Sequence, residues 1–215
     1  MVSVVVRCRN EERYVGYTIQ SIYDYFGYDV EIIIVDNEST DNSIRVVNTF
    51  EYLNIKKIDI KKNDYTPGRA LNLGVQHCTG DYILLLSAHC QITEMDFEND
   101  IKKKLDNGYV AVWRKQIPIW NGKKISQRYM WSNFKDKSSV NYYCKWEDRY
   151  FLHNAFAFYK RDTITENPFD EHWAGKEDRY WANDMIEKDK EIYYNYDMKC
   201  HHFYTDRGAT WKGVG

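Results

Sequence analysis

The stretch Gly80-Asp81-Tyr82-Ile83-Leu84-Leu85-Leu86-Ser87-Ala88-His89-Cys90 decides the fold of this chain. Its run of apolar residues is typical of a buried strand, and a small polar cluster follows the run directly. In open α/β sheets, ligands bind beyond the carboxyl ends of the strands. We therefore expect Ser87, Ala88 and His89 to lie at the mouth of a binding site.

Strand and helix patterns alternate through the first half of the chain. Runs of β-forming residues predict strands at 3–6, 31–35, 56–60, 82–86 and 109–112. Helical spacing predicts helices at 12–26, 41–50, 68–78 and 97–105, the second of them capped by Ser39 or Thr40. After about residue 115 the pattern weakens, with a helix expected at 177–188 and an extended segment at 191–196. The alternation indicates an α/β fold with a mostly parallel central sheet and helices on both faces.

Length and composition exclude several classes of function. The 215 residues favour one domain. The net charge of -2 gives no electrostatic reason to expect a nucleic-acid partner. No apolar run is long enough for a membrane span, and the first residues lack the basic region of a signal peptide. Five cysteines without a close pairing pattern favour a reducing, cytoplasmic location.

Polar residues gather where the predicted strands end. Arg7 and Arg9 follow the first strand, Asp36 and Asn37 follow the second, and His89 follows the fourth. Turns also need such residues, so any one of them has an ordinary structural explanation. Three parallel strand ends that share one edge of a sheet favour a site.

Four ordered blocks carry a resemblance to a known family. They are VVVRCRNEE at 4–12, IVDNESTD at 34–41, PGRALNLG at 67–74 and GDYILLLSAH at 80–89. They resemble the family 2 glycosyltransferases of the GT-A fold. The similarity is greatest to a rhamnosyltransferase-like branch, in which Ser-Ala-His-Cys stands at the usual acidic DxD motif. A further block, GKEDRYW at 175–181, supports the resemblance.

The resemblance implies a single GT-A domain over residues 1–215. Residues 1–115 are expected to bind the nucleotide sugar, and residues 116–215 the acceptor and the catalytic base. The activity implied is an inverting transfer of a hexosyl or deoxyhexosyl group from a nucleotide-diphosphate donor to a glycan or other hydroxyl acceptor.

The same resemblance assigns residues to the donor. Arg7, Arg9 and Glu11 match the loop that meets the base, and Asp36 and Asp41 flank a second loop. Asn37 stands where many relatives carry an aspartate that contacts uracil, and its amide both accepts and donates. The donor base is therefore left open among UDP, dTDP and GDP types. Arg69 and Asn72 match the block under the diphosphate and ribose, although Asn72 is equally expected to pack on a neighbouring loop.

The DxD acids of relatives hold a divalent cation at the diphosphate, and here Ser87 and His89 take their places. Imidazole suits Mn²⁺ better than Mg²⁺. His201 or His202, near a predicted strand end, is expected to join His89 at an Mn²⁺ site. Two alternatives remain open: a structural zinc on Cys90, Cys200 and the histidines, and a His89 that only hydrogen-bonds phosphate.

Glu177 and Asp178 are the candidate catalytic carboxylates. Inverting transfer needs a base that takes the proton of the acceptor hydroxyl. In related enzymes the second acid of the pair is the usual base, so Asp178 is preferred and Glu177 is the alternate. Acids in a first helical turn also stabilise the helix dipole, which is the structural explanation of the pair.

Aromatic residues surround the acid pair. Trp173, Tyr180 and Trp181 are candidates for stacking on sugar or for the core. Trp211 lies in a glycine-rich tail, which we expect to fold over the donor as a lid.

Two other classes of function remain open. A nucleotidyltransferase shares the topology, but the first loop lacks the glycines of such enzymes. A non-catalytic module that binds nucleotide or glycan is favoured by the missing DxD acids and disfavoured by the Glu177-Asp178 pair.

Overall fold

The structure is a computed structural model that describes residues 1–114, 116–120, 123–124, 136–145 and 147–204. Its strands are β1 (Val2–Cys8), β2 (Val30–Asp36), β3 (Ile55–Asp59), β4 (Tyr82–Ser87), β5 (Cys90–Glu94), β6 (Ala111–Trp113), β7 (Gln116–Trp120), β8 (Lys123–Lys124), β9 (Ser139–Val140), β10 (Tyr143–Cys144), β11 (Arg149–Tyr150), β12 (Phe156–Lys160), β13 (Ile192–Tyr194) and β14 (Lys199–Phe203). Its helices are α1 (Val15–Phe26), α2 (Ser43–Asn48), η1 (Lys62–Asp64), α3 (Pro67–Gln76), η2 (Phe97–Ile101), α4 (Lys102–Asp106), α6 (Arg161–Glu166) and α7 (Glu177–Glu187). No helix in this described part is both long and apolar enough to cross a lipid bilayer.

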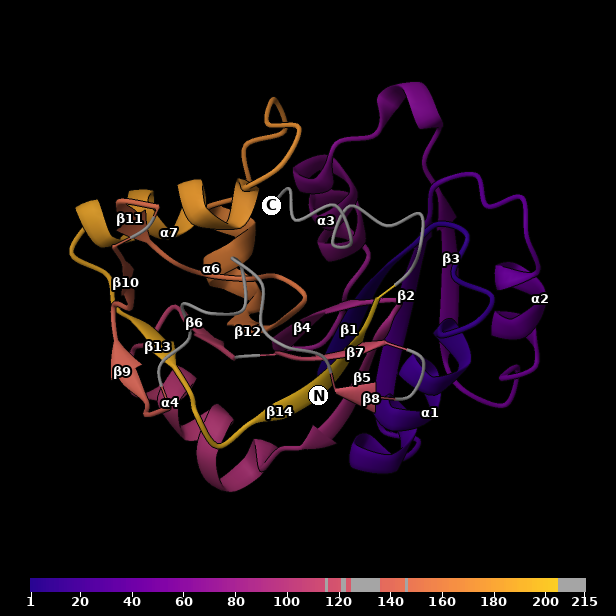
Figure 1. The fold of residues 1–215 in the computed structure, drawn as a ribbon, viewed down its shortest axis with the longest axis horizontal. Coiled ribbons are helices and arrows are strands. Elements are labelled where there is room, and N and C mark those ends of the chain that lie inside the picture. The colour runs from indigo at the N-terminus through magenta and orange to yellow at the C-terminus, as the bar shows by residue number, and fades with distance from the viewer. Residues whose placement is uncertain (115, 121–122, 125–135, 146, 205–215) are drawn as a thin grey trace.

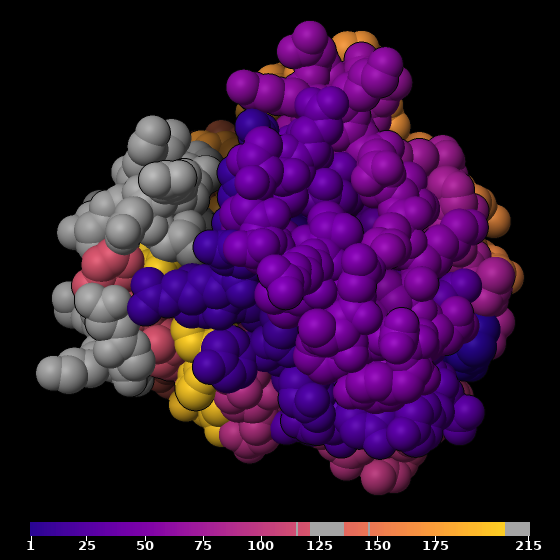
Figure 2. Space-filling model, turned by 90° about the vertical axis from the view of Figure 1, so that its right-hand side faces the viewer, coloured from indigo at the N-terminus to yellow at the C-terminus, as the bar shows by residue number. Residues whose placement is uncertain are grey.

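The central sheet has the strand order β3-β2-β1-β4-β12-β6-β13-β9 (Figure 1). Strands β3, β2, β1 and β4 run parallel, as does the pair of β6 and β13. Strand β12 is antiparallel to both β4 and β6, and β9 is antiparallel to β13. The expected α/β fold with a mostly parallel sheet is confirmed. Seen from the β3 edge, the surface is formed mainly by the N-terminal part of the chain (Figure 2).

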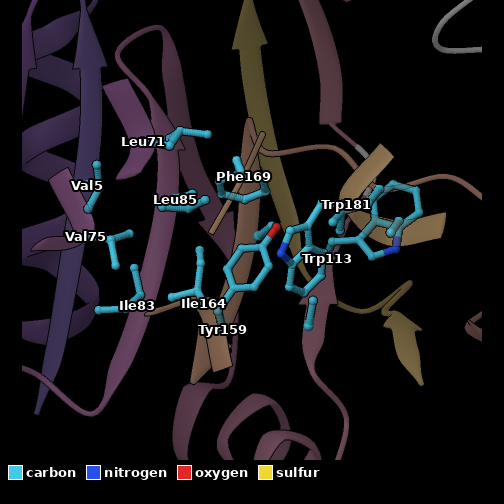
Figure 3. Close-up of a cluster of buried hydrophobic side chains, with 14 of the residues drawn as sticks. Val5, Leu71, Val75, Ile83, Leu85, Trp113, Tyr159, Ile164, Phe169 and Trp181 are labelled. Carbon is cyan, nitrogen blue, oxygen red and sulfur yellow. The ribbon is translucent and has the colours of Figure 1, made fainter. Parts of the chain in front are cut away.

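Buried side chains form a hydrophobic core on each face of this sheet. One core packs α3, α6 and α7 against the sheet through residues such as Leu71, Ile164 and Trp181 (Figure 3). The other packs α1, α2 and α4 against the opposite face through Ile19, Val47 and others. Because strand side chains alternate between the faces, Val4 and Val5 of β1 enter different cores. Helices therefore cover both faces, as expected.

A second sheet of order β5-β14-β7-β8 packs on the α1 side. Strand β5 begins at Cys90, directly after the polar cluster that ends β4. Strand β14 lies between β5 and β7, so the histidines at 201 and 202 lie within a strand of this small sheet rather than near the end of a central strand. This sheet holds β14 beside the carboxyl edge of β4.

Some local expectations were wrong. The residue at the N-cap of α2 is Asn42, and neither Ser39 nor Thr40 caps it. Both residues make other hydrogen bonds instead: Ser39 Oγ donates to Asp36 Oδ1, and the backbone N of Thr40 donates to Asn10 Oδ1. The expected helix at 97–105 begins as the π-helix η2 before it becomes α4.

Candidate active site

The carboxyl ends of three parallel strands meet at one edge of the sheet. In the strand register Arg7 lies beside Ser87, and Cys8 lies beside Asp36. Ser87 and Ala88 are both buried, and the backbone O of Ala88 accepts a hydrogen bond from Thr18 at 2.8 Å. The polar cluster therefore lies at the sheet edge where the strand pattern placed it.

The loop after β1 and the loop after β2 are joined by hydrogen bonds. The backbone N of Glu11 donates to Ser43 Oγ at 2.6 Å, and that of Glu12 donates to Asp41 Oδ2 at 3.0 Å. Asp36 accepts from both the backbone N and the Oγ of Ser39. Asp36 and Asp41 thus shape the loops of the expected donor site, while Arg9 remains exposed on the first loop.

Asn37 lies at the centre of this loop pair. Its backbone N donates to the carbonyl of Cys8 at 2.9 Å, which fixes the residue against β1. Its side chain is buried, and Oδ1 has no hydrogen-bond partner within the described residues. A buried amide oxygen without a partner is costly, so this atom is suited to accept a hydrogen bond from a ligand.

His89 is paired with Glu11 from the first loop. Its Nδ1 lies 2.8 Å from Glu11 Oε1, and both side chains are mostly shielded from solvent. Glu11 Oε2 is buried and has no hydrogen-bond partner in the part of the chain that the structure describes. The contact places a carboxylate directly behind the imidazole that is expected at the position of the second DxD acid.

The two other histidines of the expected cation site lie on opposite faces of β14. His202 is buried, and its ring centre lies 4.7 Å from that of His89. His201 is partly exposed and its ring contacts Phe203 on the other face. The structure therefore brings His202 to His89 and does not bring His201 there.

The donor set at this place is compatible with a cation held jointly with a diphosphate. Within the described residues, no group of three or more His, Cys, Asp or Glu side chains is arranged to hold a metal ion. His89 offers a ring nitrogen, and the buried imidazole of His202 lies beside it, a type of donor that Mn²⁺ accepts. The remaining ligands must come from the donor. A structural zinc on Cys90 and Cys200 has no support in the described arrangement.

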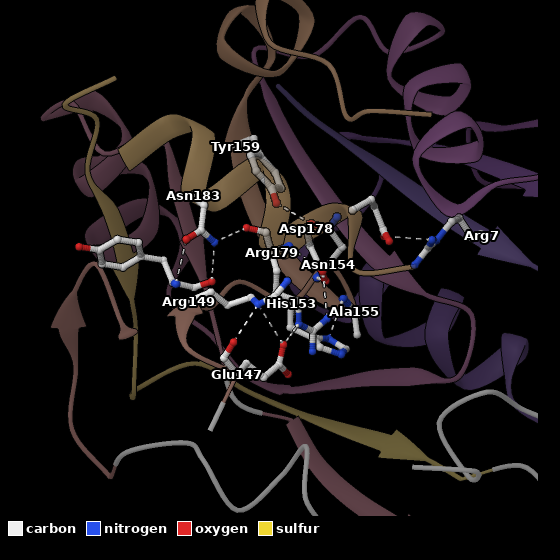
Figure 4. A network of polar contacts seen from close by, with 12 residues as sticks. Arg7, Glu147, Arg149, His153, Asn154, Ala155, Tyr159, Asp178, Arg179 and Asn183 are labelled. Carbon is white, nitrogen blue, oxygen red and sulfur yellow. Dashed lines mark hydrogen bonds and ion pairs between the residues drawn. The ribbon is translucent and has the colours of Figure 1, made fainter. Parts of the chain in front are cut away.

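Glu177 and Asp178 begin α7 and are both buried, and Figure 4 shows Asp178 beside Asn154 and Arg179. Glu177 Oε1 lies 3.4 Å from Arg7 Nη1, so the acid pair reaches the end of β1. Asp178 accepts hydrogen bonds from the backbone N of Asn154 at 3.1 Å and from Arg179 Nη1 at 2.9 Å. Glu177 thus faces the carboxyl end of β1. Asp178 is held by Arg179 of its own helix and by Asn154, which lies two residues before β12.

The surroundings move the pKa values of the two acids apart. Burial and the neighbouring charge of Asp178 raise the pKa of Glu177, against the opposing effect of Arg7. Burial also acts to raise the pKa of Asp178, but Arg179 and the other donors outweigh it and lower the pKa overall. Such divergence is typical of carboxylates with different chemical roles.

Asn72 and Arg69 of α3 face the loop that precedes α7. Asn72 Nδ2 donates to the carbonyl of Phe169 at 2.8 Å, and Asn72 Oδ1 accepts from the backbone N of Phe169 at 3.0 Å. Packing on a neighbouring loop, one of the two expectations for Asn72, therefore describes its observed contacts. Arg69 is half exposed and lies 3.9 Å from Glu171, beside a surface pocket of about 460 Å³.

Several buried groups of the site were missed in the sequence. Arg179 joins Asp178 to Glu147, its Nε lying 3.5 Å from Glu147 Oε2, and packs over the ring of Phe151. Burial, and then the charge of Arg179, lower the pKa of His153 to about 3, so this imidazole is neutral. Arg179 lies in the expected helix, but its partners Glu147 and Phe151 lie where the sequence pattern is weak, so local patterns gave no signal of this network. Trp211 lies outside the described residues.

The sequence profile of Glycosyl transferase family 2 matches residues 3–167. The chain belongs to this family. Among curated relatives, the O-antigen chain rhamnosyltransferase RfbN of Salmonella typhimurium is 26% identical over 189 residues, which are 84% of this chain and 60% of the relative. The minor teichoic acid biosynthesis protein GgaA of Bacillus subtilis is 24% identical, over 88% of this chain and 44% of the relative. The chain thus spans less than two thirds of the length of these relatives.

Solved structures share the GT-A fold. Residues 1–349 of TarS from S. aureus superpose with a TM-score of 0.71 at 21% identity, covering 95% of this chain and 60% of that one. The mannosyltransferase PcManGT from Pyrobaculum calidifontis, solved with GDP-Man and Mn²⁺, superposes with a TM-score of 0.72 at 19% identity, covering 98% and 59%. At these identities the likeness shows the fold of this family 2 member and nothing more.

Proposed function

We propose that this family 2 glycosyltransferase moves a hexosyl or deoxyhexosyl group from a nucleotide-diphosphate donor to a glycan hydroxyl, with inversion at the anomeric carbon. The main support for this proposal is that the expected diphosphate position and the Glu177-Asp178 pair lie at the same edge of the central sheet. Arg7 lies beside Ser87 in the register and 3.4 Å from Glu177, so the expected diphosphate position adjoins the acid pair. The structures of TarS in complex with UDP-GlcNAc and of PcManGT in complex with GDP-Man support a nucleotide-sugar donor.

In the proposed site the first two loops bind the nucleotide. Asn37 Oδ1, buried and without a partner in the described residues, accepts a hydrogen bond from the base. Arg7, beside Ser87 in the strand register, is proposed to offset the charge of the diphosphate. Arg9 is an exposed cation on the first loop, and Arg69 is an exposed cation on α3, 3.9 Å from Glu171. The unpaired, buried thiols support the expected reducing, cytoplasmic setting.

His89 and His202 are the proposed nitrogen ligands of a divalent cation, with Glu11 behind His89. When bound, the cation supplies charge that stabilises the leaving diphosphate. Burial is the main cause that lowers the pKa of His202, which keeps this imidazole in the neutral form that a ligand needs. Glu11 orients the His89 ring through Nδ1.

Asp178 is the proposed base, and Glu177 is the alternate. The acceptor proton passes to a carboxylate oxygen as the hydroxyl attacks, and the diphosphate leaves from the opposite side. Asp178 first has to loosen one of its hydrogen bonds, for which Arg179 can swing towards Glu147, its other partner. Glu177 is less engaged and has the raised pKa, so a test must separate the two acids.

The deciding experiment compares Asp178→Asn with Glu177→Gln. Asp178→Asn is expected to lower sugar transfer by about 10²–10⁴-fold, the usual value of a general base, with nucleotide affinity nearly unchanged. Thermal shifts with UDP, dTDP and GDP, each with and without Mn²⁺, measure that affinity and identify the nucleobase of the donor. A larger loss of transfer in Glu177→Gln would reassign the role, and full activity in both variants would refute the mechanism.

The pH profile adds an independent test of the same assignment. A carboxylate base must be ionised, so kcat/KM falls as the pH drops through its pKa. Because the pKa of Asp178 is lowered, the fall is expected below the ordinary range of an aspartate. Because the pKa of Glu177 is raised, an acid limb nearer neutrality would instead point to Glu177.

A further inference from the structure

A partly exposed aromatic stack flanks the acid pair in the sequence. The indole of Trp173 packs on the ring of Tyr180, with ring centres 4.1 Å apart and planes 17° from parallel. Arg149 lies near the same tyrosine, with its guanidinium carbon 5.4 Å from the ring centre. We call Trp173 and Tyr180 the aromatic platform.

Trp173 does not belong to the core. It is 41% exposed, whereas Trp113 and Trp181 are buried in the described structure. Trp181 uses its indole N–H within the fold, donating to the carbonyl of Asn167 at 2.6 Å. One face of Trp173 is occupied by Tyr180, so its exposure leaves apolar ring surface available on the outside.

The loop that carries Trp173 is held at both ends. Asn72 binds the backbone N and O of Phe169, and Asp170 accepts from the backbone N of His172 at 2.9 Å. The loop then enters α7 through Lys176 in a left-handed conformation (orange, at the top of Figure 1). A ring held in place before binding loses little conformational entropy when a ligand stacks on it.

The platform is placed beside the reacting groups. Tyr180 follows Glu177 by three residues on α7, so the two side chains share one face of the helix about one turn apart. One helical turn is about 5 Å, a span comparable to one sugar ring. A glycan whose hydroxyl reaches the acid pair would therefore place a neighbouring sugar ring at Trp173.

We propose that the aromatic platform is an acceptor subsite that binds one pyranose ring of the acceptor glycan by stacking on Trp173. The proposal rests on the proposed function, because it assumes a glycan acceptor. An apolar ring face suits the C–H surface of a pyranose. Arg149, near Tyr180 in space, and Lys176, near Trp173 in the sequence, are the candidates to bind its hydroxyls. The subsite would select acceptors and leave donor binding unchanged.

The test is an NMR titration of the whole chain labelled with ¹⁵N-tryptophan, with UDP present. The Trp173 indole signal is identified by its loss in Trp173→Phe. The probes are the methyl glycosides of glucose, galactose, N-acetylglucosamine and rhamnose, each raised to about 100 mM, well above a millimolar Kd. At least one glycoside is expected to shift the Trp173 signal saturably and leave the Trp181 signal unmoved.

Two variants complete the test. Trp173→Ala is expected to weaken binding of that glycoside about threefold to tenfold, the range of one stacking contact, with Trp173→Phe between it and the unmodified chain. Tyr28→Ala is the matched control, because Tyr28 is 66% exposed and contacts the ring of Tyr23 edge-to-face at the opposite end of the strands. It is expected to leave glycoside binding unchanged.

Separate readouts distinguish the proposed acceptor subsite from the proposed glycosyltransferase function. If no glycoside moves the Trp173 signal, or if Trp173→Ala binds as the unmodified chain does, the subsite is refuted. If Trp173→Ala loses the thermal shift caused by UDP or another nucleotide, the platform serves the donor and the proposal is also refuted. If no nucleotide stabilises the unmodified chain, the proposed function fails, while the glycoside titration still reports on the platform.

Discussion

The carboxylate of Glu11 determines which ring nitrogen of His89 is available to a ligand. The contact of Nδ1 with Glu11 at 2.8 Å fixes the ring and leaves Nε2 as the nitrogen for a cation or a phosphate. Carboxylates that support metal-binding histidines in this way raise the basicity of the ligand. The role of Glu11 in the proposed cation site can therefore be measured separately from that of His89.

Glu11→Gln is expected to raise the Mn²⁺ concentration needed for half-maximal nucleotide binding by about 10–100-fold, the usual cost of losing such a carboxylate. Thermal shift at a fixed nucleotide concentration measures this requirement. Glu12→Gln is the matched control, because it removes the same charge from the next residue, whose carboxylate binds Asn42 on the protein surface. Equal Mn²⁺ requirements in the two variants would contradict a cation on His89.

The sequence supplied these residues but not their contacts. Polar residues after strands predicted that Arg7, Asn37 and His89 lie at one edge, because parallel strands end together. The pairing of His89 with Glu11 spans 78 positions and depends on a loop conformation with Asn10 at φ 53°. Local patterns do not encode such a contact. The separation of His201 from His202 follows from strand alternation, but the sequence pattern did not predict a strand at 199–203.

Helix α3 connects the donor half of the site to the loop before α7. Its Asn72 side chain satisfies the backbone N and O of Phe169, which is 97 positions away. Without the amide these buried groups would lose their partner. The helix thereby fixes the start of the loop that carries Trp173.

Asn72→Ala is expected to lower the free energy of unfolding by about 1–3 kcal/mol, the cost of leaving buried polar groups unsatisfied. Urea unfolding with an unchanged m-value measures the loss. Gln76→Ala on the same helix is the control, because Gln76 is exposed. If the two variants differ by less than about 0.5 kcal/mol, the loop does not depend on Asn72.

Close packing of α3 on the sheet gives a second prediction for this element. A Cβ at Gly74 would meet Val5 Cγ1 well inside van der Waals contact and Val35 Cγ2 at 3.1 Å. Gly74→Ala is therefore expected to destabilise the chain by about 1–3 kcal/mol through overpacking. Gly175→Ala is the control, since a Cβ there meets nothing within 4 Å. Equal urea midpoints for both variants would show that α3 is free to move away from β1.

Prediction of whole elements succeeded where the chain is locally regular. The strands and helices up to residue 87 follow clear periods, and their observed bounds lie close to the expected ones. Strand β12 (Phe156–Lys160) was missed because its antiparallel place between β4 and β6 is set by long-range pairing. The mostly buried strand shows no alternation of apolar and polar residues that would identify it.

At the scale of the molecule, the two cores enclose all of the thiols. The five cysteines are unpaired and buried, and they are spread over both faces of the central sheet. Burial, followed by the charge of Asp36, raises the pKa of Cys8 to about 12, and burial raises that of Cys78 to about 12. Since the thiolate is the reactive form, Cys8 and Cys78 are protected both by their burial and by their raised pKa, and the other three thiols are protected by burial.

The folded chain is therefore expected to react with a thiol reagent such as DTNB only as fast as it opens, and all five thiols are expected to react together in urea. Tyr28→Cys supplies the control, because Tyr28 is exposed and its new thiol must react at once in the folded state. Rapid reaction of Cys8 alone would show that the carboxyl edge of β1 opens independently of the cores. Uniformly slow labelling would instead show that the site edge, both cores and the small sheet unfold as one cooperative unit, as expected for strands shared between two cores.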